Sequence, residues 1–378
     1  MRNFRKIIIR VAVVVLIFAI INQGLNFIFV PYSYVAVDYH NLKQKEYDIL
    51  YVGTSHGKCG IDPTEAEAVS GKSGVNLCLG GEYPAYTYYM VKQACSIHIP
   101  EQIVYEIDGG YWTTDEYIGT DSCSIFGEMD FSAVKAEFFL KHFFSQDFRV
   151  TLFPWYNYRK EYRMIKKNIS NKLSGADKSY DTSVFQDASQ EYREDGFIYR
   201  YPVADEEKGF TNFVEWNSGE VREEHLVYFE KLVKFCKEKD IELTLLITPV
   251  PQETYEAYQA SYDQEHAYIA ALAEKEGLEW ALSVPTPEIA DILCMKLLRN
   301  HPEADKLAGE LLSYNDSSDV SLPKYVGLRL LLNLIQIGKI TTDKAKRYIS
   351  NEEALSSPLT ARLLSQLKEE ILFLEEGI

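Results

Sequence analysis

Basic residues are scarce in this chain of 378 residues, in which 39 Lys and Arg stand against 56 Asp and Glu and give a formal net charge of −17. A protein that binds nucleic acid needs a basic face to neutralise phosphates, so the composition excludes nucleic acid as a partner. The same balance argues against a body that lies flat on anionic lipid. A hydrophobic content of 46% with 25% charged residues is typical of globular proteins and excludes wholesale disorder.

Residue patterns that bind metals or phosphate groups are also missing. None of the six cysteines stands in a C-x-x-C or another metal-ligand spacing. His40, His98, His142 and His225 are far apart in the sequence, and no Gly-rich loop of the G-x-x-x-x-G-K-[ST] type occurs. We therefore expect neither a metal ion nor a cofactor.

An apolar stretch begins close to the N-terminus. Four basic residues and no acid stand among the first ten residues, and residues 11–21 are wholly apolar. Residues 7–30 are long enough to cross a bilayer as a tilted helix, and the basic flank predicts a cytoplasmic N-terminus with an exported body. We expect an uncleaved signal anchor, a transmembrane helix over residues 1–30, in a single-pass protein of the cell membrane. A cleaved signal peptide is the alternative, although no small-x-small cleavage site follows residue 21.

After an expected linker over residues 31–45, predicted strands and helices alternate. The strands are predicted over residues 47–53, 74–78, 102–108, 241–247 and 278–284. The helices between them are predicted over residues 63–69, 84–97, 220–239 and 255–276. Alternating strands and helices predict parallel pairing with right-handed crossovers. We expect an α/β domain over residues 31–285, built as a three-layer α/β/α flavodoxin-like parallel sheet.

Two segments depart from this alternation. Residues 111–219 are rich in Tyr, Phe and Trp, and we expect them to form an insertion that covers one end of the sheet. Residues 286–378 show helical periodicity with few strand signals, which predicts a C-terminal helical tail. Its helices are expected over residues 287–299, 302–314, 324–337, 342–349 and 358–376.

The first strand ends in the run Gly-Thr-Ser-His-Gly over residues 53–57, which fits the spacing Gly-x-Ser-x-Gly. In open α/β sheets the ligand crevice lies at the carboxyl ends of the strands, where a helix N-terminus can stabilise an oxyanion. Ser55 is therefore a candidate nucleophile, and a plain helix N-cap is the alternative. Thr54 and His56 are expected beside the crevice, His56 bonding locally rather than acting as the base. Asp108, which ends the third strand, either lines the crevice or caps its turn.

Three runs carry a resemblance to a known family: DILYVGTSHGKCGIDP, GVNLCLGGEYPAYTYYMVKQA and QIVYEIDGGYW. Together they resemble the SGNH/GDSL hydrolase superfamily, and more closely its membrane-anchored branch that includes the D-alanyl-lipoteichoic acid biosynthesis protein DltD. The resemblance covers residues 47–284. It implies that Ser55 is the nucleophile and that Gly80, after the second strand, donates a backbone N–H to the oxyanion hole. Gly81 is a close alternative to Gly80.

The chain departs from this family where the base should lie. The family has Asp-x-x-His just after its last strand, whereas the literal match here, Asp263 with His266, falls within the helix before that strand. His301 follows the last strand at a plausible distance and would work with another acid, such as Asp291. The other possibility is that the catalytic pair has been lost. A Ser hydroxyl needs such a base to become a nucleophile, so these two possibilities separate an enzyme from a binding protein.

The resemblance implies a cell-surface serine esterase or O-acyltransferase that acts on an envelope polymer or acylated glycan through a seryl acyl intermediate. It also implies a membrane-bound O-acyltransferase as a partner. The alternative is a non-catalytic relative that binds or scaffolds an envelope polymer.

Overall fold

A computed structural model describes most of the chain. It covers residues 2–201, 215–248, 250 and 252–282, and nearer the C-terminus residues 304, 306, 308, 312, 322–336, 339–349, 364–368, 371, 372 and 374.

A five-stranded sheet forms the centre of the body. Its strands are β1 (Ile49–Val52), β2 (Gly74–Asn76), β3 (Gln102–Glu106), β6 (Glu242–Ile247) and β7 (Glu279–Leu282). They lie in the order β2-β1-β3-β6-β7, and all four pairings are parallel. All four residues of β1 are buried, as expected for a parallel strand covered on both faces. The α/β class expected from the sequence is confirmed.

Helices follow the strands in the predicted places. They are α3 (Ser55–Gly60), α4 (Pro63–Ser70), α5 (Pro84–Cys95), α13 (Glu223–Lys239), α14 (Gln252–Ala257) and α15 (Gln259–Glu276). On one face of the sheet Leu50 and Ile103 belong to a cluster that includes Phe229 of α13. On the other face Ile49 and Tyr51 pack with Ala66 of α4 and neighbouring residues. Because successive strand side chains point to opposite faces, this alternation covers both sides of β1.

The segment between β3 and α13 is mainly helical. Its helices are α6 (Gly110–Thr113), α7 (Thr120–Glu128), α8 (Ala133–Phe138), α9 (Arg149–Leu152), α10 (Pro154–Tyr158), α11 (Ile165–Ser174) and α12 (Ala176–Ser179). Shorter turns are the π-helix η1 (Phe139–Phe143) and the 3₁₀ helices η2 (Tyr162–Met164), η3 (Thr182–Phe185), η4 (Glu194–Gly196) and η5 (Ser218–Glu220). The strands β4 (Gln190–Tyr192) and β5 (Ile198–Arg200) form an antiparallel pair. Aromatic contacts join this segment to the body, with Phe138 stacked on Tyr89 of α5 at a centroid distance of 4.2 Å.

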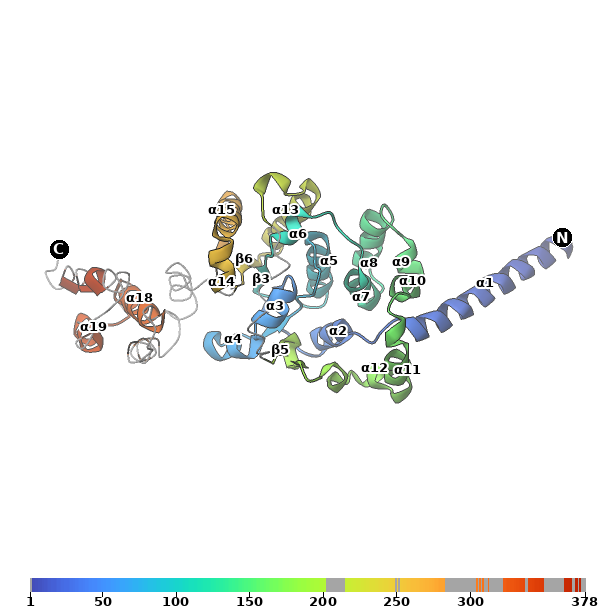
Figure 1. The fold of residues 1–378 in the computed structure, drawn as a ribbon, viewed down its shortest axis with the longest axis horizontal. Helices are drawn as coiled ribbons and strands as arrows, with labels where there is room; N and C mark the ends of the chain where they lie inside the picture. The colour runs from blue at the N-terminus through green and yellow to red at the C-terminus, as the bar shows by residue number, and fades with distance from the viewer. Residues whose placement is uncertain are drawn as a thin grey trace.

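The N-terminal helix α1 (Arg2–Phe29) projects from the body beside α10 and α11 (Figure 1). Its large apolar side chains between residues 7 and 21 are about half exposed or more. Within the described part of the chain, no helix is long and apolar enough to cross a membrane.

The expected linker after α1 contains a helix instead. Helix α2 (Tyr34–Gln44) begins at Ser33, whose side chain accepts a hydrogen bond from the Val35 N–H. It buries Val35, Tyr39 and Leu42 in the main core. The linker prediction was wrong over these residues because their polar and apolar positions mix evenly, and only tertiary packing decides their conformation.

In the C-terminal part, helices α18 (Leu322–Gln336) and α19 (Thr342–Ile349) match two of the predicted helices. Among the described residues they belong to a hydrophobic cluster whose buried members lie between positions 304 and 371 and include Leu331, Ala345 and Leu367. This part therefore has a core of its own.

A buried ion pair joins α2 to α3. Lys58 is 2% exposed, and its Nζ donates to Asp38 Oδ2 and to the carbonyl of Asn76, each at 2.9 Å. The Tyr192 hydroxyl from β4 donates to the other Asp38 oxygen at 2.5 Å. The Lys58 Nζ also lies 4.9 Å from the centre of the Tyr34 ring. A single charged group thus connects four segments that are distant in sequence.

Substitution of Lys58→Met should destabilise the body strongly, because it leaves the Asp38 carboxylate buried without its counter-charge. We expect a loss of about 3–5 kcal/mol in the free energy of unfolding. Lys72→Met breaks the exposed Lys72–Glu101 pair and should cost at most about 1 kcal/mol. Thermal unfolding of both variants tests this, and equal shifts would contradict the structural role of Lys58. Adding Asp38→Asn to Lys58→Met should recover part of the loss.

Candidate functional site

The turn after β1 presents Ser55 to solvent. Gly53 has φ +140°, and a Cβ there would lie 2.3 Å from the Glu106 carbonyl oxygen, so the turn requires glycine. Thr54 is buried and caps α3, because its side chain accepts from the His56 N–H at 3.3 Å. Ser55 is the exposed first residue of α3. The N-cap role is thus filled by Thr54, and the Ser55 hydroxyl is not needed for it.

A buried carboxyl group, that of Glu106, holds this turn in place through hydrogen bonds. Glu106, the last residue of β3, is fully buried. Its Oε2 accepts from the Thr54 N–H at 2.7 Å and from the Thr54 hydroxyl at 2.9 Å. Its Oε1 accepts from the Thr248 hydroxyl at 3.1 Å. Burial raises the pKa of Glu106, while the Thr54 N–H opposes that shift. Glu106 therefore positions the turn and does not reach solvent.

An imidazole and a carboxylate meet at the same end of the sheet as Ser55. His56 Nδ1 is 3.5 Å from Asp108 Oδ2, and both side chains are partly exposed. The other Asp108 oxygen accepts from the Gly110 N–H at 3.0 Å. The structure thus brings His56 and Asp108 together, and Asp108 both lines the site and caps its own turn.

These residues lie where the order of the strands reverses. From β1 the chain passes to β2 on one side, and β3 pairs with β1 on the other. The crevice of a doubly wound sheet lies outside the carboxyl ends of the strands at this switch point. Ser55 follows β1 and Asp108 follows β3, so the two residues flank the expected ligand position.

The glycine pair after β2 lies close to the same turn. Leu79 donates its N–H to the Gly53 carbonyl at 2.8 Å, and Gly80 follows directly. Gly81 has φ +68°, a conformation that favours glycine. Next to it Glu82 is buried, and burial raises its pKa well above the ordinary range. The Leu79 contact places this glycine turn next to the turn that carries Ser55.

Helix α15 supplies a second acid to the site. Glu265 Oε1 accepts from the Gly109 N–H at 2.8 Å, directly after Asp108. Burial raises the pKa of Glu265 to about 7, and the negative charges of Asp108 and Glu106 add to the shift. Trp216 covers the same turn by donating its Nε1–H to the Gly109 carbonyl at 3.0 Å.

The literal Asp-x-x-His match does not form a catalytic pair with Ser55 in the described contacts. Asp263 accepts from the Tyr255 hydroxyl at 2.6 Å. His266 is buried and stacks on the Tyr255 ring at 6.3 Å, and burial lowers its pKa. His301 and Asp291 lie outside the described residues.

Glu106 and Glu265 were missed by the sequence analysis. An acid at the end of the otherwise buried third strand was the available signal for Glu106. Nothing local marks Glu265, because its position depends on how α15 packs against the loop after β3.

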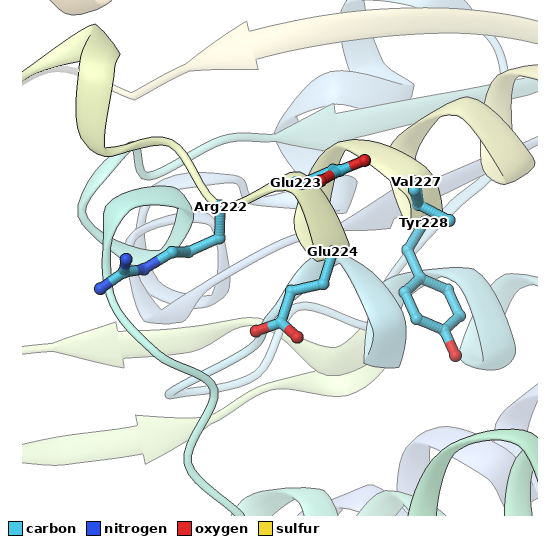
Figure 2. A pocket seen from close by; sticks show the side chains of 5 residues that line it. All are labelled: Arg222, Glu223, Glu224, Val227 and Tyr228. Atoms are coloured by element: carbon cyan, nitrogen blue, oxygen red, sulfur yellow. The ribbon is translucent and has the colours of Figure 1, made fainter.

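A shallow hollow lies at the start of α13, away from these residues (Figure 2). Its volume is about 540 Å³, and its lining residues are Arg222, Glu223, Glu224, Val227 and Tyr228. None of them is a predicted site residue. Within the described part of the chain no group of three or more His, Cys, Asp or Glu could hold a metal ion.

Comparisons of this chain with known protein families, with curated proteins and with solved structures give no match. Fold and site together define an α/β protein with a serine-bearing turn at the switch point of a parallel sheet.

Glu265→Gln should make stability less dependent on pH. Because the folded pKa of Glu265 is raised from 4.5 to about 7, its protonated form stabilises the fold below pH 4.5, and that stabilisation is lost as the pH rises through about 7. The loss amounts to at most about 3 kcal/mol. Glutamine keeps the acceptor for the Gly109 N–H and stays neutral, so the variant should unfold at a higher temperature than wild type at pH 8 and at a similar one near pH 4.5.

Trp fluorescence during heating follows this transition, since Trp216 lies on the same turn. Glu274→Gln, an exposed position on the same helix, is the matched control. A gain that is equal at both pH values, or equal in the control, would contradict the assignment.

Proposed function

We propose that this protein is a serine esterase or O-acyltransferase of the cell surface that acts on an envelope polymer or acylated glycan. The observation that carries the proposal is the exposed Ser55 at the switch point, with the His56–Asp108 pair beside it. An acyl-transfer enzyme needs a nucleophile, a base and an orienting acid in this kind of arrangement.

The finer fold assignment is part of this proposal. The strand order β2-β1-β3-β6-β7 corresponds to the flavodoxin-like order, and helices contact both faces of the sheet. A nucleophilic Ser after the first strand and a Gly turn after the second are the features of the SGNH/GDSL hydrolases that the sequence resembles. These observations support a three-layer α/β/α hydrolase of that superfamily, close to its DltD-like branch.

In the proposed reaction, Ser55 Oγ attacks the acyl carbonyl of the donor ester. In this proposal the Ser55 proton passes to His56 Nε2, because Nδ1 faces the Asp108 carboxylate. The role of base for His56 replaces the expectation from the sequence that this residue only bonds locally. N–H groups near Gly80 and at the start of α3 stabilise the negative oxygen. The protonated His56 then gives its proton to the leaving alcohol. Water or an acceptor hydroxyl attacks the acyl-Ser55 and loses its proton to His56. His56 then returns this proton to Ser55 Oγ as the free acid or the new ester leaves.

A membrane location fits the exposed surface of α1. A helix that is apolar all round lies within protein or within a membrane. Residues 11–21 are wholly apolar, and their large side chains are about half exposed or more, Phe18 included. This exposure and the basic N-terminal flank support the membrane location. With the N-terminus in the cytoplasm, the site would face the envelope, where a membrane-bound O-acyltransferase could supply acyl groups.

A fluorophosphonate probe should label the full-length chain in detergent at Ser55, because an activated serine attacks phosphorus as it attacks an ester carbonyl. Ser55→Ala should abolish labelling and lower hydrolysis of a chromogenic acetyl ester by at least about 10³-fold. Ser70→Ala on α4 is the control and should leave both unchanged. Unlabelled wild-type protein with unchanged ester hydrolysis in Ser55→Ala would favour the polymer-binding alternative.

The base is tested by His56→Ala and His301→Ala in the same assay. The labelling rate should fall about 10²- to 10⁴-fold in His56→Ala and stay near wild type in His301→Ala. Asp108→Asn should lower the rate as well, since it removes the charge that orients His56. The opposite result for the two His variants would transfer the role of base to His301.

Membrane attachment through α1 is tested by alkaline extraction of membranes that contain the full-length chain. Wild type should stay in the membrane pellet, whereas Val14→Asp/Ile17→Asp should be released, because each Asp near the centre of a span costs about 2.5–3.5 kcal/mol. Val69→Asp/Val227→Asp places the same charges at exposed apolar positions of the body and should be retained. Release of wild type would refute the anchor.

A further inference from the structure

The C-terminal end of α1 is held by a group of short helices that we call the collar, residues 148–179. Trp155 of the collar donates its Nε1–H to Asn22 Oδ1 at 2.9 Å and its backbone N–H to Asn26 Oδ1 at 3.0 Å. Lys172 Nζ donates to the carbonyls of Asn26 and Phe27 at 3.0 and 2.9 Å. These carbonyls lie in the last turn of α1, where the helix dipole favours a cation. The Asn26 carbonyl also accepts from the Val30 N–H at 3.0 Å. In Figure 1, α10 and α11 accordingly lie beside the base of α1.

Because the collar binds the C-terminal end of α1, only the part of the helix before Asn22 is free of these polar contacts. Residues 7–21, which are apolar apart from Arg10, lie outside the polar contacts of the collar and span about 22 Å at 1.5 Å per residue. The hydrocarbon core of a bilayer is about 30 Å thick. A short apolar stretch is accommodated by thinning of the bilayer or by flanking residues that enter it. The collar is the part of the body that flanks the apolar stretch of α1.

The collar carries the apolar surface that this geometry requires. Phe153 packs edge-on against Phe18 of α1 at 5.6 Å between ring centres, so the apolar surface of α1 continues onto the collar. Leu152 and Leu173 are 51% and 75% exposed. Other exposed apolar or aromatic side chains of the collar are Phe148, Tyr162 and Met164. Aromatic residues with one polar edge, such as Trp155, are enriched where membranes meet water.

The collar has a positive net charge, opposite in sign to that of the whole chain. Residues 148–179 contain eight Lys and Arg against two acids, a local net charge of +6 in a chain whose total is −17. Lys160, Lys166 and Lys167 are exposed, and none forms an ion pair within the described residues. Such a cluster beside a membrane helix attracts anionic headgroups.

We propose that the collar binds the membrane surface, with its apolar side chains among the lipid tails and its lysines on anionic phospholipid headgroups. This inference rests on the proposed membrane attachment of α1 and extends it. The overall acidity of the chain then repels the rest of the body from the same surface. The collar is thus the part of the body that faces the lipid, and it fixes the orientation of the body above the membrane.

Brominated lipids test the proposal, because bromine quenches Trp fluorescence on contact. The full-length chain is reconstituted into phosphatidylcholine vesicles with or without phosphatidylglycerol, using lipids brominated close to the headgroup. We expect quenching of wild type that is stronger with phosphatidylglycerol and is absent in Trp155→Phe, which assigns the signal to the collar. Lys166→Glu/Lys167→Glu should reduce the quenching to the phosphatidylcholine level. The control Lys234→Glu/Lys239→Glu makes the same charge change on α13 and should behave as wild type.

Vesicle flotation separates failure of this inference from failure of the anchor. If the full-length chain floats but Trp155 is not quenched, the collar does not touch lipid and the inference is wrong. If Trp155 is quenched equally with and without phosphatidylglycerol, the lysines do not bind anionic headgroups and the proposal is overturned in that part. If the chain does not float, the anchor fails together with the collar. Labelling of Ser55 is independent of all three outcomes.

Discussion

The ammonium group of Lys58 is enclosed by the Asp38 carboxylate, the Asn76 carbonyl and two tyrosine rings. Lys58 belongs to the short helix that begins with Ser55, whereas Asp38 belongs to the helix after α1 and Tyr192 to the insertion. A buried charge needs its partner in place, so these segments must assemble together or not at all. The position of the serine turn therefore depends on α2 and on the insertion as much as on the sheet.

The sheet could be predicted because its signals are local. The apolar runs around β1 and β6, each followed by a helix, indicate parallel strands whatever the rest of the chain does. Helix α4 was also predictable, since Asp62 caps it and Pro63 stands in its first turn. Helix α2 was not, because its polar residue Asp38 is buried, and its partner Lys58 is 20 residues further along the chain. Burial of such a pair is decided by tertiary structure.

In the site, too, some features follow from local sequence signals and others are decided by tertiary structure. The strand-end rule placed Ser55 and Asp108 at one edge of the sheet from the sequence alone. The contact between Asp108 and His56 depends on side-chain directions, which the sequence pattern does not contain. Glu106 and Glu265 converge on this edge from positions 159 residues apart. Burial raises the pKa of both groups, and the N–H donors of Thr54 and Gly109 oppose that shift. Spacing rules describe neighbours along one element and therefore do not report such convergence.

Because α1 docks on the insertion through Trp155 and Lys172, separation of the body from its N-terminal helix would change more than its location. The donors of Lys172, Asn168 and Trp155 would lose their acceptors on α1, and the apolar ring of Phe153 would lose Phe18. A body released by proteolysis after residue 30 would thus carry an exposed apolar and cationic patch. Such a fragment would be prone to self-association or to adhesion to anionic surfaces, so cleavage would alter the behaviour of the body as well as separating it from α1.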